Sequence, residues 1–139
     1  MSAVVTAGAA IAAALSLAAA AGVLHNRRSG TLRDTVHPQD LDTAELGLSR
    51  TTATIVHFTA VWCGPCAAVR RVIHQVCADL PQVAHVEIDM DANPGAARRL
   101  SVLSLPTTFI FDAEGRQRYR SAGVPKAADL KAVLEPMLT

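Results

Sequence analysis

Aromatic residues are scarce in this chain of 139 residues, at 4% of the total, although half of the residues are hydrophobic. The chain also has no large excess of positive or negative charge: the formal net charge is +1 and no long basic run occurs. This argues against nucleic acid as a partner. Three cysteines are few, and an odd number, for a secreted domain held together by disulfides. A domain of about 110 residues is stable without such links, so the cysteines are free for chemistry.

The N-terminal segment differs in composition from the rest of the chain. Residues 2–24 contain no charged side chain and no proline, and a helix that spans a membrane needs roughly 20 apolar residues. A cleaved signal peptide is one alternative, although the positively charged start and the shorter apolar core are missing. A soluble alanine-rich helix is another. We expect a transmembrane anchor, or an uncleaved signal anchor, over residues 1–24.

Basic residues follow the apolar segment but do not precede it. Arg27, Arg28 and Arg33 lie just beyond it, whereas only the α-amino group is positive before it. The positive-inside rule then predicts a single-pass membrane protein with its soluble domain in the cytoplasm. The alternative is an exported domain. Residues 25–30 are expected to form a linker, and residues 31–139 a domain.

Strand and helix patterns alternate along this domain. Strands are predicted where β-branched and apolar residues run together, and helices where apolar residues recur at every third or fourth position. The expected strands are 31–36, 51–59, 83–89, 107–111 and 116–121, and the expected helices are 38–48, 64–80, 93–100 and 130–138.

This order of elements predicts an α/β fold with a mixed central sheet. Helices between successive strands imply parallel pairing in its middle, and the closing hairpin adds an antiparallel side. Residues 83–89 are expected to form a second central strand. Residues 116–121, which carry alternating arginines, are expected at an edge.

Two cysteines flank a Gly-Pro pair directly after the second predicted strand. A structural zinc site requires four ligands, and the scattered histidines offer no matching arrangement, so no metal is expected. Haem attachment would require a histidine where Ala67 stands. A redox couple fits better, because the start of a helix favours a thiolate at Cys63. Cys63 would attack a substrate disulfide, and Cys66 would resolve the mixed disulfide.

The third cysteine has a different setting. Cys77 lies on the same predicted helix as Cys66, about 16 Å further along its axis, which is too far for a disulfide. Its position falls within the apolar stripe of that helix. We expect Cys77 to be buried and inert.

Three ordered motifs resemble the thioredoxin family over residues 31–139. They are Trp62-Cys63-Gly64-Pro65-Cys66 after a strand, Asp91-Ala92-Asn93-Pro94 at a strand end, and Leu105-Pro106-Thr107 before another strand; Gly115 and Gly123 match as well. The resemblance implies the thioredoxin fold, with helices on both faces of the sheet. It implies no cofactor beyond the redox-active Cys63–Cys66 disulfide. It also implies that substrates dock along Trp62, Gly64, Pro65, Leu105, Pro106 and Gly123.

The resemblance further implies a cis peptide bond at Pro106, facing the two sulfurs. The sequence alone leaves a trans proline at the start of a strand equally open, because only about one X-Pro bond in twenty is cis.

Two positions depart from the family pattern. The aspartate that thioredoxins usually carry six residues before the first cysteine is His57 here, and the lysine that partners it aligns with Glu87. We hypothesise that His57 accepts the proton of Cys66 and that Glu87 holds the imidazole in one tautomer. The alternative is a histidine that only makes local hydrogen bonds.

Together with the apolar N-terminal segment, the resemblance implies a membrane-anchored thiol-disulfide oxidoreductase that reduces protein disulfides and is reduced again by an electron-donor reductase. Gly-Pro between the cysteines resembles the reducing members of the family. One alternative is an extracytoplasmic thiol-disulfide enzyme for the maturation of cysteine-containing proteins. Another is a redox-silent scaffold that holds a partner on the thioredoxin surface.

Overall fold

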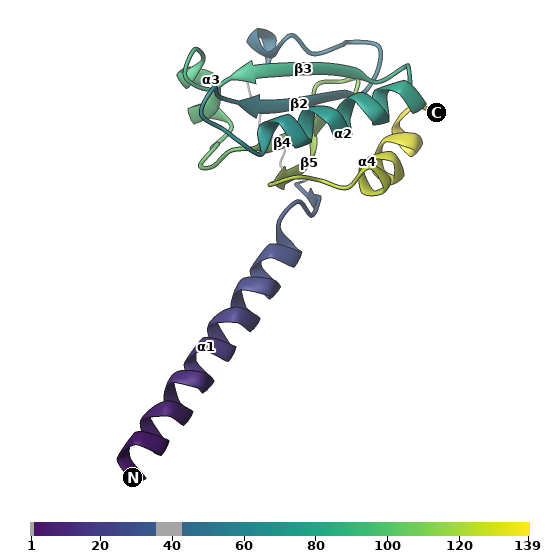
Figure 1. The fold of residues 1–139 in the computed structure, drawn as a ribbon. Helices are drawn as coiled ribbons and strands as arrows, with labels where there is room; N and C mark the ends of the chain where they lie inside the picture. Colours follow the sequence, from purple (N-terminus) through teal and green to yellow (C-terminus); the bar gives the residue numbers. More distant parts are fainter. Residues whose placement is uncertain (1, 36–42) are drawn as a thin grey trace.

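The computed structural model describes residues 2–35 and 43–139, which form a long N-terminal helix and a sheet domain (Figure 1). The helix α1 (Ser2–Arg28) projects away from the domain, and its apolar stretch is not buried against protein. Its length and composition would allow it to cross a membrane or to act as a signal sequence. The helix continues through residues 25–28, which were expected in the linker, because basic residues in a last turn interact favourably with the helix dipole.

A five-stranded sheet forms the centre of the domain, in the order β1-β5-β4-β2-β3. The β2 and β3 strands are parallel, whereas β2–β4, β4–β5 and β1–β5 pair in antiparallel fashion. The mixed sheet predicted from the sequence is therefore confirmed. The strands are β1 (Arg33–Asp34), β2 (Thr54–Thr59), β3 (Ala84–Asp89), β4 (Thr107–Phe111) and β5 (Gln117–Ala122).

Two predictions about strand position are wrong. The β3 strand is not central but lies at one edge, and β5 is not at an edge. The reason is that the first strand, shortened to Arg33–Asp34, pairs with β5 instead of β3. Because β5 is covered, its arginines find partners within the domain: Arg120 donates hydrogen bonds to the carbonyl oxygens of Leu100 and Ser101.

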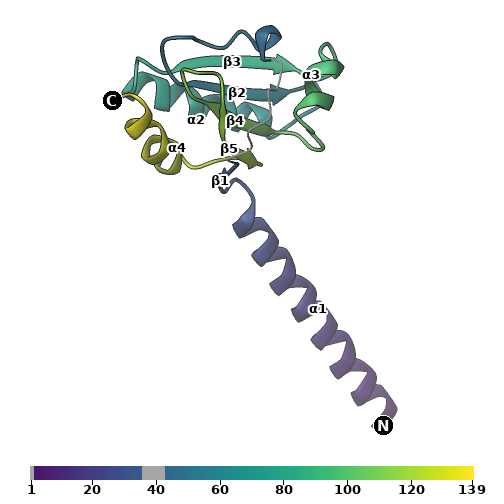
Figure 2. The same cartoon turned by 180° about the vertical axis from the view of Figure 1, so that it is seen from behind.

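Helices cover both faces of the sheet, as the thioredoxin resemblance implies (Figures 1 and 2). Two of them, α2 and α4, pack on one face, and η1 and α3 pack on the other. Of the helix predicted over residues 38–48, residues 38–42 lie outside the described residues, and a single 3-10 turn, η1, follows them. The helices are η1 (Ala44–Leu46), α2 (Cys66–Asp79), α3 (Pro94–Arg99), α4 (Ala127–Leu134) and η2 (Glu135–Met137).

The β2 strand separates two apolar cores, and all six of its residues are buried. Side chains alternate between the faces of a strand. Val56 and Phe58 therefore pack towards α3, whereas Ile55 packs against α2 and α4. By the same alternation, His57 lies on the α2 face of the sheet.

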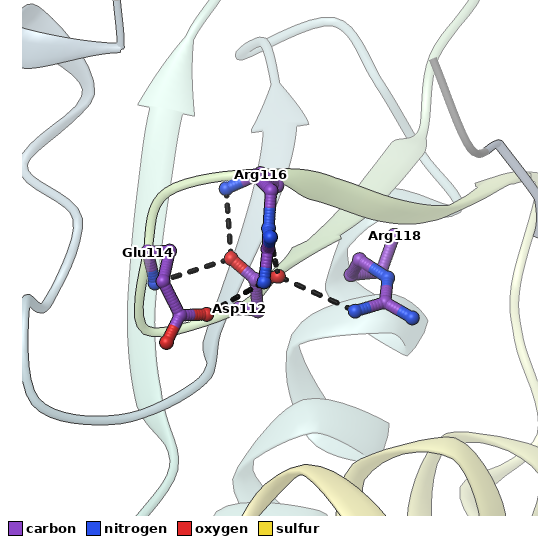
Figure 3. A network of polar contacts seen from close by, with 4 residues as sticks. All are labelled: Asp112, Glu114, Arg116 and Arg118. Atoms are coloured by element: carbon purple, nitrogen blue, oxygen red, sulfur yellow. Dashed lines mark hydrogen bonds and ion pairs between the residues drawn. The ribbon is translucent and has the colours of Figure 1, made fainter. Parts of the chain in front are cut away.

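Asp112 organises the turn between β4 and β5 (Figure 3). One carboxylate oxygen accepts hydrogen bonds from the backbone N–H groups of Glu114 and Arg116, and the other accepts from the side chains of Arg116 and Arg118. Burial alone would raise the pKa of Asp112, but these hydrogen bonds hold it below its usual value. Gly115 completes the turn at φ 78°, a conformation that favours glycine.

Candidate active site

The two motif cysteines form a disulfide where the β2–α2 connection meets the helix. Their Cα atoms are 5.5 Å apart. The helix α2 begins at Cys66 with Pro65 as its cap, so that Cys63 and Gly64 precede it. Cys63 is partly exposed, whereas Cys66 is 2% exposed. Only Cys63 can therefore be reached by a disulfide of another protein.

The buried cysteine has a backbone acceptor close by. The Cys66 sulfur lies 3.9 Å from the carbonyl oxygen of Phe58. In the disulfide this sulfur carries no proton, but after reduction its thiol can donate a hydrogen bond to that oxygen. Such a bond favours the protonated form of Cys66. Attack by Cys66 on a mixed disulfide therefore requires a group that takes up its proton.

The predicted docking residues lie on three separate loops. The Leu105–Pro106 peptide bond is cis, which confirms that expectation, and the Pro106 carbonyl oxygen accepts a hydrogen bond of 2.9 Å from the Gly123 N–H. Trp62 is 64% exposed, and its indole N–H donates a hydrogen bond of 2.9 Å to Asp91. Gly64 and Pro65 lie exposed between the cysteines. The structure thus links Pro106 to Gly123 and fixes the orientation of an exposed Trp62.

His57 is completely buried under α2. Its Nδ1 atom lies 3.1 Å from Nε2 of His85 on β3, so one of the two rings donates a hydrogen bond to the other. Its Nε2 atom has no hydrogen-bond partner and lies 3.9 Å from Oε2 of Glu87. The ring of His74, on the exposed surface of α2, contacts that of His85. A row of three imidazoles thus leads from a buried position to solvent.

Glu87 is held mainly by α2. Arg70 binds both carboxylate oxygens of Glu87, at 2.9 and 2.5 Å, and this hydrogen bonding lowers the pKa of Glu87. When Nδ1 carries the proton and donates to His85, the Nε2 lone pair of His57 is free to take up a second proton. The Glu87 carboxylate, 3.9 Å from Nε2, stabilises the imidazolium that results. His57 is therefore held by His85 through a hydrogen bond and by Glu87 through charge.

Burial dominates the protonation of this cluster. It lowers the pKa of His57 to about 4, although the Glu87 carboxylate acts in the opposite direction. Burial, followed by the charge of His74, also lowers the pKa of His85. Both imidazoles are therefore neutral near pH 7.

Among the described residues, one group has the spacing of metal ligands, with its ligand atoms within 4.8 Å of one another. It consists of His57, His85 and Glu87. However, Arg70 already occupies both oxygens of Glu87. A metal ion would have to displace this guanidinium group.

Sequence analysis missed His85 and the pairing of Arg70 with Glu87. Alternation along β3 contains the signal, because residues 85 and 87 must share a face of the strand. Cys77 is half-buried instead of fully buried. It packs against the α2 side of the core, and burial raises the pKa of its thiol, which fits an unreactive cysteine.

A disulfide at the start of a helix and a cis-proline before a strand, on a mixed sheet covered on both faces, define a thiol-disulfide oxidoreductase of the thioredoxin class. The family model for thioredoxin matches residues 40–136. The chain therefore belongs to the thioredoxin family. Thioredoxins work through a redox-active disulfide without a cofactor, and the Cys63–Cys66 disulfide fits that chemistry.

Individual relatives agree with this assignment. The chain is 37% identical to a thioredoxin of Chlamydia trachomatis over 70 residues, which are 50% of this chain and 68% of that protein. It is 35% identical to a thioredoxin-like protein of Synechocystis over 96 residues, which are 68% and 90% of the two chains. The crystal structure of chloroplastic thioredoxin z superposes with a TM-score of 0.59 at 31% identity, over 75% of this chain and 92% of that one.

We expect the substitution His57→Gln to weaken the pH dependence of stability. The pKa of His57 is about 4 in the folded protein and 6.5 without the fold. In that window the unfolded chain binds a proton that the folded chain does not, so the free energy of unfolding falls as the pH falls from 6.5 towards 4. Urea unfolding of the oxidised full chain in detergent should show that the wild type loses up to roughly 3 kcal/mol more than the variant over this window.

The exposed His25 on α1 provides the control, and His25→Gln should follow the wild type. Identical pH dependence in the wild type and in His57→Gln would contradict a neutral, buried imidazole at this position.

Proposed function

We propose that this chain reduces protein disulfides, with Cys63 as the nucleophile and Cys66 as the resolving cysteine. The observation that carries the proposal is the pairing of an accessible Cys63 with a buried Cys66 at the start of α2. Unpaired N–H groups and the positive end of the helix dipole stabilise a thiolate next to this helix start.

The reaction proceeds in two exchanges. The Cys63 thiolate attacks one sulfur of the substrate disulfide, a mixed disulfide forms, and the other substrate sulfur leaves as a thiolate. Cys66 then attacks the Cys63 sulfur, which releases the second substrate sulfur and forms the Cys63–Cys66 disulfide. Two electrons have passed from the dithiol to the substrate. An electron-donor reductase restores the dithiol.

Substrate docks on the surface around the disulfide. Trp62, Gly64 and Pro65 form one side of this surface, and Leu105, Pro106 and Gly123 form the other. The cis bond before Pro106 and its hydrogen bond to Gly123 support this assignment, because they hold backbone groups of two loops in a fixed arrangement beside each other.

His57 accepts the proton that Cys66 loses during the second exchange. His57 directly precedes Phe58, whose carbonyl oxygen contacts the Cys66 sulfur. A pKa of about 4 makes the imidazolium form short-lived, so His57 passes the proton on instead of storing it. Glu87 stabilises that form by its charge. The hydrogen bond to His85 supplies the next acceptor towards solvent.

Residues 1–24 anchor the chain in a membrane as a single span, and the domain that begins at residue 31 faces the cytoplasm. The exposed apolar surface of α1 supports the anchor. The basic residues in its last turn support the orientation. Reduction of protein disulfides agrees with a cytoplasmic location.

We expect Cys66→Ser to trap substrate and Cys63→Ser to abolish the reaction. Without Cys66 the mixed disulfide cannot be resolved, so a substrate protein remains linked to Cys63 on a non-reducing gel. Insulin reduction driven by dithiothreitol should fall in both variants by on the order of a hundredfold or more relative to the wild type. Cys77→Ser is the matched control and should retain activity. A wild-type protein without reductase activity would favour the redox-silent scaffold.

We expect His57→Ala and Glu87→Gln to slow the second exchange and not the first. The first substitution removes the acceptor for the Cys66 proton, and the second removes the charge that stabilises the protonated acceptor. General base catalysis typically accelerates a step by about 10²–10⁴-fold. Rapid-quench measurements of the mixed disulfide across a range of pH separate the two steps. Gln75→Ala, at an exposed position of α2, is the control. Unchanged resolution in both variants would refute the role of His57.

We expect an alkaline phosphatase fused after Thr139 to be inactive and a cytoplasmic reporter at the same place to be active. The basic residues that follow α1 retain the domain in the cytoplasm. An active phosphatase would instead favour the alternative function, an extracytoplasmic thiol-disulfide enzyme for the maturation of cysteine-containing proteins.

A further inference from the structure

The end of the N-terminal helix is packed against the active-site loops. The Gly30 N–H donates a hydrogen bond of 2.6 Å to the carbonyl oxygen of Ala122. A Cβ atom at Gly30 would lie 2.1 Å from the carbonyl oxygen of Val124, and one at Gly123 would lie 2.3 Å from the Ser29 hydroxyl. Backbone atoms leave no room for a side chain at Gly30, and Gly123 has a φ of 93°, which favours glycine. The segment after α1 is therefore held at the end of β5 (Figures 1 and 2).

This contact builds a cavity next to the proposed docking surface. The cavity has a volume of about 470 Å³. The end of α1 and the start of the domain line one side with Arg28 and Arg33, and the loops of the docking surface line the other with Leu105 and Gly123. Leu105 and Gly123 belong to the proposed docking surface, so the cavity adjoins the place where we propose that substrate backbone docks.

The cavity is positively charged. Among the residues that the structure describes, its lining includes two arginines and His25 but no carboxylate. Within residues 2–35 and 43–139, neither Arg28 nor Arg33 forms an ion pair, whereas Arg70 and Arg116 do. Asp34 follows Arg33 in β1, so its side chain points to the opposite face of the strand. Two guanidinium groups thus remain available to a ligand.

We propose that Arg28 and Arg33 bind a carboxylate side chain of the substrate that lies close to its disulfide cysteine. The chain therefore prefers disulfides flanked by aspartate or glutamate. This inference rests on the proposed reductase function, because it requires substrate to dock beside Leu105 and Pro106. The cavity walls favour a substrate over a lipid headgroup, since half of the lining belongs to the active-site loops and not to α1.

Matched peptide disulfides provide the test. Three peptides carry the same mixed disulfide with thionitrobenzoate and differ only in glutamate, glutamine or lysine beside the cysteine. The full chain is first reduced with dithiothreitol, which is then removed, and it is assayed in discs of uncharged lipid; released thionitrobenzoate gives the second-order rate constant of the first exchange. We expect the glutamate peptide to exceed the lysine peptide by about five- to tenfold at low salt, with a smaller ratio at high salt.

The double variant Arg28→Gln, Arg33→Gln should bring this ratio close to one. Arg50→Gln changes an exposed arginine elsewhere in the domain and should keep the wild-type ratio. Glutamine removes the positive charge while keeping an N–H donor, so loss of a ratio that also falls with salt reports on charge.

Each outcome has one meaning. Equal reduction of all three peptides by the wild type, or an unchanged ratio in the double variant, would overturn the preference while leaving the reductase function intact. Failure to reduce any peptide would refute the reductase function itself. If the double variant instead loses only its binding to vesicles that contain phosphatidylglycerol, the arginines serve the bilayer and the proposal is wrong.

Discussion

Complete burial of β2 is the constraint on which the rest of the structure depends. The strand lies between β3 and β4, and its side chains fill the cores on both faces of the sheet. Because both faces are packed, a shift of register by one residue would exchange the two sets of side chains. The register in turn places Cys63 beyond the end of the strand and His57 under α2. The reactive disulfide and the buried imidazole are thus fixed by the same packing.

The burial that positions His57 also limits its chemistry. An apolar surrounding disfavours a charged imidazole, and the low pKa of His57 follows from it. Three neighbours stabilise the buried His57 ring. His85 shares a hydrogen bond with it, Glu87 supplies negative charge, and Arg70 keeps Glu87 ionised. These contacts are the structural basis for the proposal that His57 moves a proton and does not keep it.

Much of this arrangement can be predicted from the sequence, and the predictions that were wrong have identifiable causes. Local hydrophobic patterns predict the strands at 107–111 and 83–89 and the helix after the cysteines, because each of these elements buries the side chains that form its pattern. Strand order failed because Arg33–Asp34 carries too little pattern to reveal that it pairs with β5. His85 was missed because its meaning depends on which strand lies next to β3. The cysteine pair was predicted because both reactive residues lie within four consecutive positions of the sequence.

The segment at Ser29 and Gly30 shows how composition can mislead about mobility. Serine and glycine are typical of flexible linkers, yet here Gly30 is buried and its close approach to Val124 admits no Cβ atom. Glycine is therefore required at this position both by this contact and by its φ of 82°. A flexible tether would let the disulfide sample a wide volume around the end of α1, whereas this packed segment holds it at a set distance.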